Sequence, residues 1–290
     1  MISGSIPALV TPFRNDAIDE DAIQKMVHWH IEQGSSGVVP VGTTGESATL
    51  TEREHCRVIE LVVQAVAGRI PVIAGVGSNN TREAIFYHER AQDLGADAAL
   101  HVAGYYNRPS QEGLYRHFEA LSDISTIPIV VYNIPPRAIV DILPETMARI
   151  AALPNVAGVK DATADLTRPL RERLLIEKEF SFLSGEDASA VAYNASGGNG
   201  CISVTANIAP ALCAGMQAAC RDGDFKEAMN IQDRLMPLHL ALFAEPSPAG
   251  VKYAASLLGL CDAFCRLPMV PLTDDSKTAI RRAMTGLGLI

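Results

Sequence analysis

The sequence predicts an α/β protein: a (β/α)8 barrel, the TIM-barrel fold, over residues 1–222, followed by a small C-terminal helical region over residues 223–290. Three observations indicate this. Short apolar segments alternate eight times with amphipathic ones. The apolar segments are rich in Val, Ile and Ala without period-2 alternation, which is typical of parallel strands covered on both faces. Beyond residue 222 the helical period continues, but no strand-like segment interrupts it.

Eight apolar segments are expected to form the strands. In chain order they are 6–11, 37–41, 71–76, 98–102, 127–134, 156–160, 180–184 and 200–204. A doubly wound open sheet is the alternative. Eight units without a dinucleotide-binding fingerprint after the first strand favour a closed barrel instead.

Helix start signals stand between these strands. Thr51 and Glu54 form a capping-box pattern that opens a helix reaching residue 67, and Asn80 with Glu83 predicts a similar start for a helix reaching residue 94. Pro144 suits a first helical turn. Further helices are expected from Pro169 and, in the C-terminal region, over 225–243, 247–258 and 274–287.

Composition narrows the class of protein. The chain of 290 residues is 48% hydrophobic and 20% charged, with a formal net charge of −9, which disfavours a nucleic-acid partner. We expect no membrane span, because no apolar stretch is long enough, and no signal peptide at the N-terminus. The six cysteines form no CxxC pair and are expected to be reduced, as in a cytoplasmic protein.

The sixth predicted strand ends in Lys160, and this residue is the centre of the functional prediction. Lysine is mostly exposed, so a solvated strand end is the ordinary interpretation. The alternative is a desolvated amine that attacks a carbonyl carbon and forms a Schiff base. The residues at the other strand ends decide between them, because the active site of a TIM barrel lies at the C-terminal ends of its strands.

These strand ends carry polar groups of a suitable kind. After the second strand, two glycines and the hydroxyls of Thr43 and Thr44 lie in the turn 42–46, which suits a small carboxylate. Tyr105 and Tyr106 follow the fourth strand, and the fifth contains Tyr132 and is followed by Arg137, which is able to bind a carboxylate. A nucleophilic amine surrounded by these groups indicates imine chemistry on anionic substrates.

Other mechanisms lack their motifs. The sequence contains no HExxH, no paired carboxylate cluster and no GxSxG elbow, so neither a metal site nor a serine hydrolase is predicted. The glycine-rich segment 197–200 precedes the eighth strand instead of following one, which argues against phosphate binding. The only covalent group required is therefore the amine of Lys160, and no cofactor is expected.

Several of these motifs closely resemble the dihydrodipicolinate synthase family of pyruvate-dependent aldolases, within the N-acetylneuraminate lyase superfamily. The matching segments are 42–46, 105–109, 132–135, 158–163 and 266–269, in the right order over essentially the whole chain. The resemblance implies a lyase that condenses pyruvate with L-aspartate 4-semialdehyde to 4-hydroxy-tetrahydrodipicolinate. That reaction is the first committed step of the diaminopimelate and lysine pathway.

The resemblance also implies a role for each site residue. Lys160 forms the imine with pyruvate, and Tyr132 relays protons together with Thr43 and Tyr106. Tyr106 comes from the neighbouring subunit in this family, which implies a dimer as the active unit and a homotetramer, a dimer of dimers, as the assembly.

The remaining site residues that the resemblance implies bind the substrates. Thr44 holds the pyruvate carboxylate and Arg137 that of the semialdehyde, while the backbone carbonyls of Gly185 and Ile202 line the site. Pro136 and Ala138 stand where the family pattern has Ser and Thr, and this departure bears on the second substrate only.

Many members of the family are inhibited by L-lysine in a cleft at the dimer interface. The matching positions here are Ser47, Ala48, His55, Asn79, Glu83 and Tyr105. Glu52 stands where lysine-sensitive relatives often carry histidine, which bears on the affinity for L-lysine.

Two rival functions stay open at the level of the sequence. Another pyruvate-dependent aldolase, such as N-acetylneuraminate lyase or a 2-keto-3-deoxy-sugar-acid aldolase, would share Lys160, Tyr132 and the turn 42–46. Arg137 and the tyrosine pair distinguish the preferred function from it. A non-catalytic barrel that acts as a sensor or scaffold would be expected to lack the lysine or its partners, and none is missing.

Overall fold

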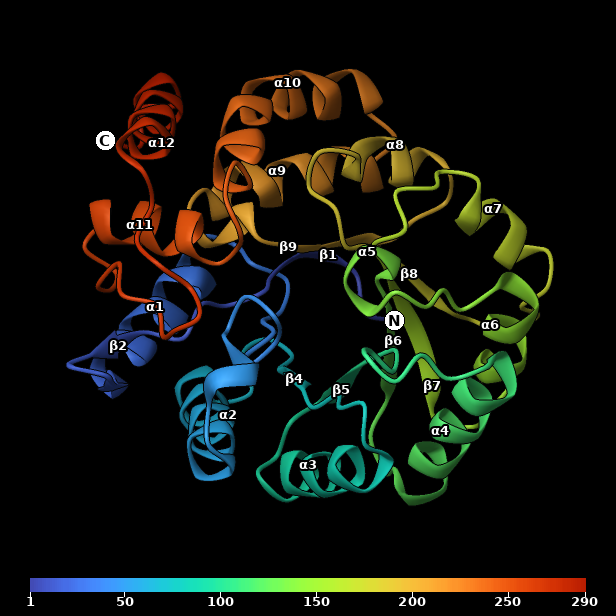
Figure 1. Cartoon of the computed structure of the whole chain (residues 1–290). Coiled ribbons are helices and arrows are strands. Elements are labelled where there is room, and N and C mark those ends of the chain that lie inside the picture. The colour runs from blue at the N-terminus through green and yellow to red at the C-terminus, as the bar shows by residue number, and fades with distance from the viewer.

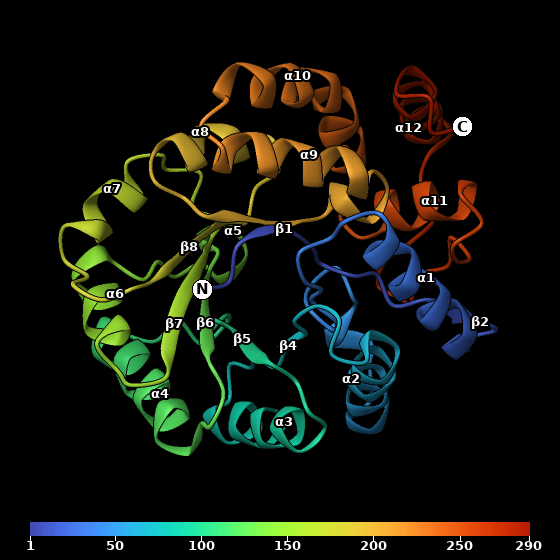
Figure 2. The ribbon, with the colours of Figure 1, turned by 180° about the vertical axis from the view of Figure 1, so that it is seen from behind.

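The computed structural model describes residues 1–290, and its central feature is a set of parallel strands curled into a barrel (Figures 1 and 2). Seven strands pair in the order β1-β9-β8-β7-β6-β5-β4, each parallel to its neighbours. Their bounds are β1 Gly4–Pro7, β4 Ile73–Gly75, β5 Ala98–Val102, β6 Ile129–Asn133, β7 Val156–Asp161, β8 Ser181–Ser184 and β9 Gly200–Ser203.

The segment around Val38 and Val39 closes the barrel between β1 and β4. Val39 N–H donates to the Pro7 carbonyl at 2.9 Å, and Ile73 N–H donates to the Val38 carbonyl at 2.9 Å. Only single bridges form here, to Ala8 and to Val72, because Pro40 lacks an N–H and the chain turns away after it. The predicted segment 37–41 therefore takes the one remaining strand position, and with the seven paired strands it makes eight. The predicted fold class is confirmed.

Twelve helices surround or extend the barrel. They are α1 Glu20–Glu32, α2 Glu52–Val66, α3 Thr81–Asp93, α4 Gln111–Ile124, α5 Pro135–Ala138, α6 Pro144–Ala151, α7 Arg168–Arg173, α8 Ala190–Ala195, α9 Pro210–Arg221, α10 Phe225–Leu242, α11 Ala249–Leu257 and α12 Asp274–Gly286. A short hairpin of β2 Phe13–Arg14 and β3 Ala17–Ile18 follows β1 and was not predicted. Its Asn15-Asp16 turn, with both residues at positive φ, is the sequence signal that marks it.

The predicted helix starts have the expected caps, with one difference. Thr51 and Glu54 form the complete capping box at the start of α2. Asn80 caps α3 by accepting from Arg82 N–H. Glu83 does not complete that cap. It accepts a short hydrogen bond from the Ser78 hydroxyl instead, which draws its carboxylate towards the rim of the barrel.

Alternating side chains of the strands face two different environments. Val130 and Tyr132 of β6 belong to the interior layer of the barrel, whereas Ile129 and Val131 pack outward against the helices. The interior layer consists of Ile6, Ala8, Val39, Ile73, Ala98, Leu100, Val130, Tyr132, Leu183 and Ile202. Both faces of a strand are therefore apolar, which explains the absence of period-2 alternation in the sequence.

The last three helices lie together at one side of the barrel (Figure 1). There α10 packs on α9, and α11 and α12 pack on α10. One hydrophobic cluster includes Val38 and Met216 from the barrel together with Leu235 and Ile280 from this region. The boundary at residue 222 remains a proposal drawn from the sequence.

Two further expectations concern the surroundings of the protein. All six cysteines are free thiols. None of the helices combines the length and the apolar character needed to cross a membrane. The cytoplasmic location stays a prediction.

Candidate active site

Lys160 lies inside the barrel, near the C-terminal end of β7. It pairs in register with Tyr132 of β6 on one side and Leu183 of β8 on the other, both members of the interior layer. The residue is only 6% exposed, and no carboxylate forms an ion pair with its amine. The ordinary interpretation, in which Lys160 is a solvated strand end, is therefore wrong. Desolvated lysines of this kind are the ones that act as nucleophiles.

The ring of Tyr132 lies beside this amine. The Lys160 Nζ lies 4.1 Å from the centroid of the Tyr132 ring, and the tyrosine is 7% exposed. The parallel register of β6 and β7 places the two side chains on the same interior face. The expected proximity of Lys160 and Tyr132 is thus present in the fold.

The turn Gly42–Glu46 follows the segment around Val38 and Val39, at the same rim of the barrel as Lys160. Thr43 is exposed and lines a cavity, whereas Thr44 is buried. Gly75 of β4 lies directly against this turn, because a Cβ atom at this position would come within 2.6 Å of the Val41 carbonyl oxygen. The two predicted threonine hydroxyls therefore lie at different depths of the site.

Gly185 and Ile202 complete the surroundings of the lysine. A Cβ atom on Gly185 would lie 3.2 Å from the Lys160 Cε and 2.9 Å from the Ala162 Cβ, so glycine allows the backbone to pass close to the amine. Ile202 of β9 belongs to the interior layer. The predicted role of their backbone carbonyls in lining the substrate site stays a prediction.

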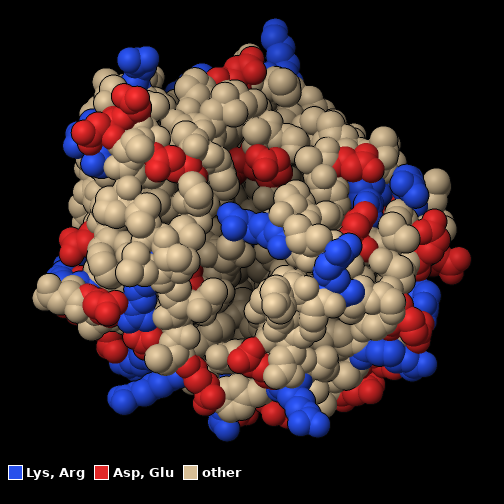
Figure 3. All heavy atoms as spheres, in the orientation of Figure 1, with Lys and Arg blue, Asp and Glu red and all other residues tan.

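A cavity of about 530 Å³ opens above the interior layer. Its wall includes Val102 and Ile134, which pack against that layer, and the exposed Arg137 of α5. No carboxylate of the chain forms an ion pair with Arg137, so its guanidinium is available to an anionic ligand. Figure 3 shows the face drawn in Figure 1, hollowed near its middle, with Lys and Arg side chains beside the hollow.

The same cavity extends to most of the positions expected to bind L-lysine. Its lining includes Ser47, Ala48, His55, Glu83 and Tyr105. Asn79 is not part of that lining, but its Nδ2 donates to the Tyr105 carbonyl at 3.2 Å. Glu52 is exposed and belongs to a separate groove beside α2 and α3.

His55 is the deepest of these residues. Its Nε2 lies 2.9 Å from the Gly75 carbonyl oxygen, so this nitrogen carries the proton, and its ring stacks on Tyr87 at 4.1 Å between centroids. Burial lowers the pKa of His55 to about 4, so the ring is neutral at physiological pH. His55 therefore lines this cavity as an uncharged polar ring, held in place by its hydrogen bond and by stacking on Tyr87.

Tyr106 lies apart from the groups it was predicted to assist. It is 89% exposed, with a φ of +67°, in the loop after β5. Asn107 braces this loop through a 2.9 Å hydrogen bond to the Asn79 carbonyl. Within one chain the structure does not bring the exposed Tyr106 to the buried Lys160, and its service to a neighbouring subunit stays a prediction.

A cluster of ionisable side chains lies behind Lys160, on the outer face of β7. Asp161 is buried there, and Glu172 of α7 is 1% exposed with no hydrogen bond to either oxygen. Arg168 pairs with Asp141 at 2.6 Å and lies 3.9 Å from Glu172. Burial, reinforced by the charge of Asp161, raises the pKa of Glu172 to about 8, and burial also raises the pKa of Asp161. The sequence did not predict this cluster, because its members come from separate segments of the chain and form no motif.

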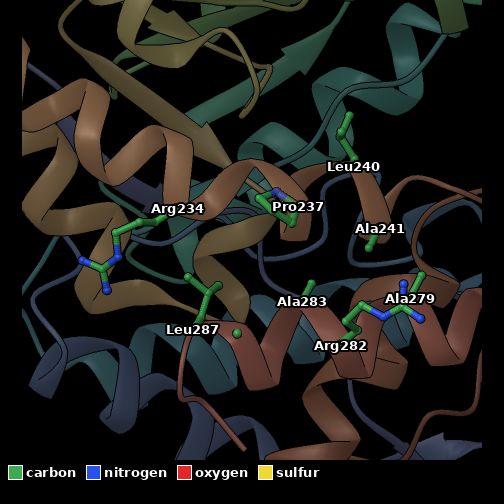
Figure 4. Close-up of a pocket in the computed structure, with 9 residues that line it drawn as sticks. Arg234, Pro237, Leu240, Ala241, Ala279, Arg282, Ala283 and Leu287 are labelled. Carbon is green, nitrogen blue, oxygen red and sulfur yellow. The ribbon is translucent and has the colours of Figure 1, made fainter.

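A second hollow lies far from these groups, between α10 and α12 (Figure 4). It measures about 560 Å³ and is lined by Arg234, Arg282 and mostly apolar side chains, with no amine, hydroxyl or carboxylate among them. No group of three or more His, Cys, Asp or Glu side chains is arranged to bind a metal ion anywhere in the chain. The groups needed for carbonyl chemistry are thus gathered at the barrel rim.

The fold and this rim define the class: a (β/α)8 barrel with a buried lysine and a neighbouring tyrosine at the catalytic end of its strands. The chain belongs to the dihydrodipicolinate synthetase family, whose family model matches residues 1–287. The 4-hydroxy-tetrahydrodipicolinate synthase of Parvibaculum lavamentivorans is 58% identical over 290 residues, and the match covers 100% of both chains.

Solved structures give the same result. The chloride-inhibited dihydrodipicolinate synthase from Acinetobacter baumannii complexed with pyruvate is 42% identical, with a TM-score of 0.97 and 100% of both chains covered. The enzyme from Cyanidioschyzon merolae with lysine bound is 36% identical, with a TM-score of 0.97 over 100% of this chain and 99% of that one. The family predicted from the sequence is confirmed, and the matches favour it over the other pyruvate-dependent aldolases.

Proposed function

We propose that this chain is a lyase that condenses pyruvate with L-aspartate 4-semialdehyde to 4-hydroxy-tetrahydrodipicolinate. The observation that carries the proposal is the buried amine of Lys160, 4.1 Å from the ring centroid of Tyr132 and without a carboxylate partner. Membership of the dihydrodipicolinate synthetase family supports the choice of substrates. The structure with pyruvate bound belongs to a relative, and it supports pyruvate as the first of the two.

The first half of the reaction uses Lys160 as the nucleophile. Its amine attacks the C2 carbonyl of pyruvate, and the carbinolamine loses water to give an imine. Loss of a proton from C3 then forms the enamine. Thr44, buried at the same rim, holds the pyruvate carboxylate, and the backbone carbonyls of Gly185 and Ile202 line the space around the adduct.

The second half joins the two substrates. The enamine C3 attacks the aldehyde carbon of the semialdehyde, and the aldehyde oxygen takes a proton from the relay of Tyr132, Thr43 and Tyr106. The amino group of the semialdehyde then attacks the imine carbon, closes the ring and displaces the Lys160 amine. Arg137, which has no partner in the chain, binds the carboxylate of the semialdehyde. No external cofactor takes part in these steps.

Borohydride trapping tests the proposal. With pyruvate present, reduction should fix the imine as a secondary amine on Lys160, located by peptide mass mapping, and Lys160→Ala should abolish it. A coupled assay with the semialdehyde should show turnover. No adduct, or an adduct on another lysine, would contradict the mechanism. Condensation with a sugar aldehyde but not with the semialdehyde would instead favour N-acetylneuraminate lyase or sugar-acid aldolase chemistry.

We also propose that L-lysine inhibits the enzyme by binding in the part of the cavity formed by Ser47, Ala48, His55, Glu83 and Tyr105, next to Asn79. The carboxylate of Glu83 and the neutral, buried His55 offer one acceptor for an ammonium group and one polar wall. A relative with lysine bound supports this. Unchanged initial rates at saturating L-lysine, with no thermal stabilisation, would overturn it.

Finally, we propose a homotetramer in which Tyr106 completes the site of the neighbouring subunit. The exposed Tyr106, together with the exposed Leu166, Leu170 and Leu174 at and around α7, provides two apolar surfaces that further copies could cover. Co-expressed Lys160→Ala and Tyr106→Phe chains test this, because a hybrid dimer contains one intact site. Random pairing should restore about a quarter of the wild-type sites. No recovery in purified hybrids would refute the shared site.

A further inference from the structure

The turn Gly42–Glu46 is held in a conformation that its own residues disfavour. Val41, which precedes the turn, and Glu46, its last residue, have φ angles of +49° and +57°, a region that a β-branched valine in particular rarely adopts. Such residues persist only where the surrounding structure over-determines them. The contacts that do so are therefore the contacts that position Thr43 and Thr44.

The barrel supplies one of these contacts. The buried Thr11 hydroxyl donates to the Gly45 carbonyl at 2.6 Å. Two further contacts come from the C-terminal region. Glu46 Oε1 accepts from Lys252 Nζ of α11 at 2.6 Å, and Glu46 Oε2 accepts from the backbone N–H of Arg266 at 2.9 Å. Both oxygens of this carboxylate are thus committed to a part of the chain more than two hundred residues away.

Lys252 is unusually deep for a lysine. It is 0% exposed, and its Nζ lies 4.3 Å from the ring centroid of Phe13, beside the guanidinium of Arg266 at 4.4 Å from the same ring. A buried ion pair is often no better for stability than apolar side chains of similar volume. Stability alone therefore does not account for an amine and a carboxylate at this place.

The position of the Glu46–Lys252 ion pair, beside the cavity wall, explains better why charged residues stand here. Ser247 and Pro248, just before α11, line the same cavity as Thr43 and Glu46, and so do Pro268 and Met269, just after Arg266. The carboxylate of Glu46 thus connects the threonine turn with both C-terminal segments of the cavity wall.

We propose that Glu46 and Lys252 are positioning residues for the reaction. Their buried ion pair sets the Thr43–Thr44 turn against the C-terminal wall of the cavity and so fixes the hydroxyl and backbone groups that receive the pyruvate carboxylate. The inference rests on the proposed function, since it assigns the turn to pyruvate. It also gives the C-terminal helical region an indirect part in substrate binding, through the threonine turn.

The test separates positioning from stability by replacing both partners with apolar side chains of similar length. The double variant Glu46→Met, Lys252→Met should still fold, because no charge is left buried alone. It should melt only a few degrees below the wild type, since the Arg266 N–H loses its acceptor. Its KM for pyruvate should rise about tenfold or more, since hydrogen bonds to the carboxylate are lost. Its KM for the semialdehyde should stay within about twofold of the wild type. Borohydride trapping should require correspondingly more pyruvate.

Lys277→Met is the matched control, because Lys277 forms only an exposed pair with Asp274 on α12. It should leave both KM values unchanged. A double variant with the wild-type KM for pyruvate, or with both KM values raised equally, overturns the positioning role. Glu46→Gln decides the matter by the same measurements if the double variant does not accumulate as folded protein. Absence of a pyruvate adduct in the wild type would overturn the proposed function itself.

Discussion

Glu172, which lies behind the candidate active site, allows the pH dependence of the free energy of unfolding to be predicted. Its side chain is buried, without a hydrogen bond to either oxygen, and faces Asp161 of β7, Arg168 of its own helix, Asp141 ahead of α6 and Tyr193 of α8. Burial and the nearby acids raise its pKa from the ordinary 4.5 to about 8. The folded protein therefore holds a proton on Glu172 that the unfolded chain releases.

The sign of the effect follows from this difference. The folded state binds the proton more tightly, so the stability contributed by the protonated carboxyl is complete below about pH 4.5 and is lost as the pH rises towards about 8. Each pH unit within this window costs about 1.4 kcal/mol. Between about pH 6 and about pH 8 the wild type should thus lose roughly 2 to 3 kcal/mol on account of Glu172.

Glu172→Gln removes the titration and keeps the shape. Measured by urea unfolding at a fixed protein concentration, the variant should gain on the wild type by roughly 2 to 3 kcal/mol between about pH 6 and about pH 8.5. Glu177→Gln, at an exposed position four residues after the end of α7 at Arg173, should show no such gain. A stability difference that stays constant with pH would refute the reasoning, as would a variant that is less stable at both values.

Three further substitutions address the site. Tyr132→Phe should lower kcat by about a hundredfold or more while borohydride still traps pyruvate on Lys160, because general acid–base catalysis is lost and the amine remains; loss of trapping would contradict this. Arg137→Met should raise the KM for the semialdehyde about tenfold or more and leave that for pyruvate unchanged in the coupled assay. Gly185→Ala should slow adduct formation about tenfold or more, because its Cβ would lie 3.2 Å from the Lys160 Cε, whereas Gly286→Ala, with nothing within 4 Å, should be neutral.

The fold could be predicted from the sequence largely because the barrel repeats one local pattern. Apolar segments, helix caps such as Thr51 with Glu54, and stop signals depend on neighbours within a few residues of each other. The exceptions have local causes as well. The segment 37–41 forms only single bridges, because Pro40 lacks a donor and Val41 has a positive φ. The Asn15-Asp16 turn of the β2–β3 hairpin is also a local signal, since both residues tolerate the positive φ that such a turn needs.

The candidate site could be predicted in part for a different reason. Counting strands places Lys160, Tyr132 and the threonine turn at one rim, since parallel strands of a barrel end on the same face. Counting does not show depth, so it left open whether Lys160 is buried and did not distinguish the exposed Thr43 from the buried Thr44. Nor does it show that Tyr106 is almost fully exposed.

The sequence did not reveal which charged side chains are buried by contacts between distant parts of the chain. Lys252 stands in a helix-like segment where a lysine is expected to be solvated, and nothing in its neighbours marks it as a partner of Glu46. Glu172 likewise belongs to an arginine-rich helix, where its expected place is the surface. Both lie behind the site and not in it, one against the threonine turn and one behind β7. A barrel rim assembled from separate strand ends needs such supports, because the groups at one strand end hold their places only as firmly as the side chains packed behind them.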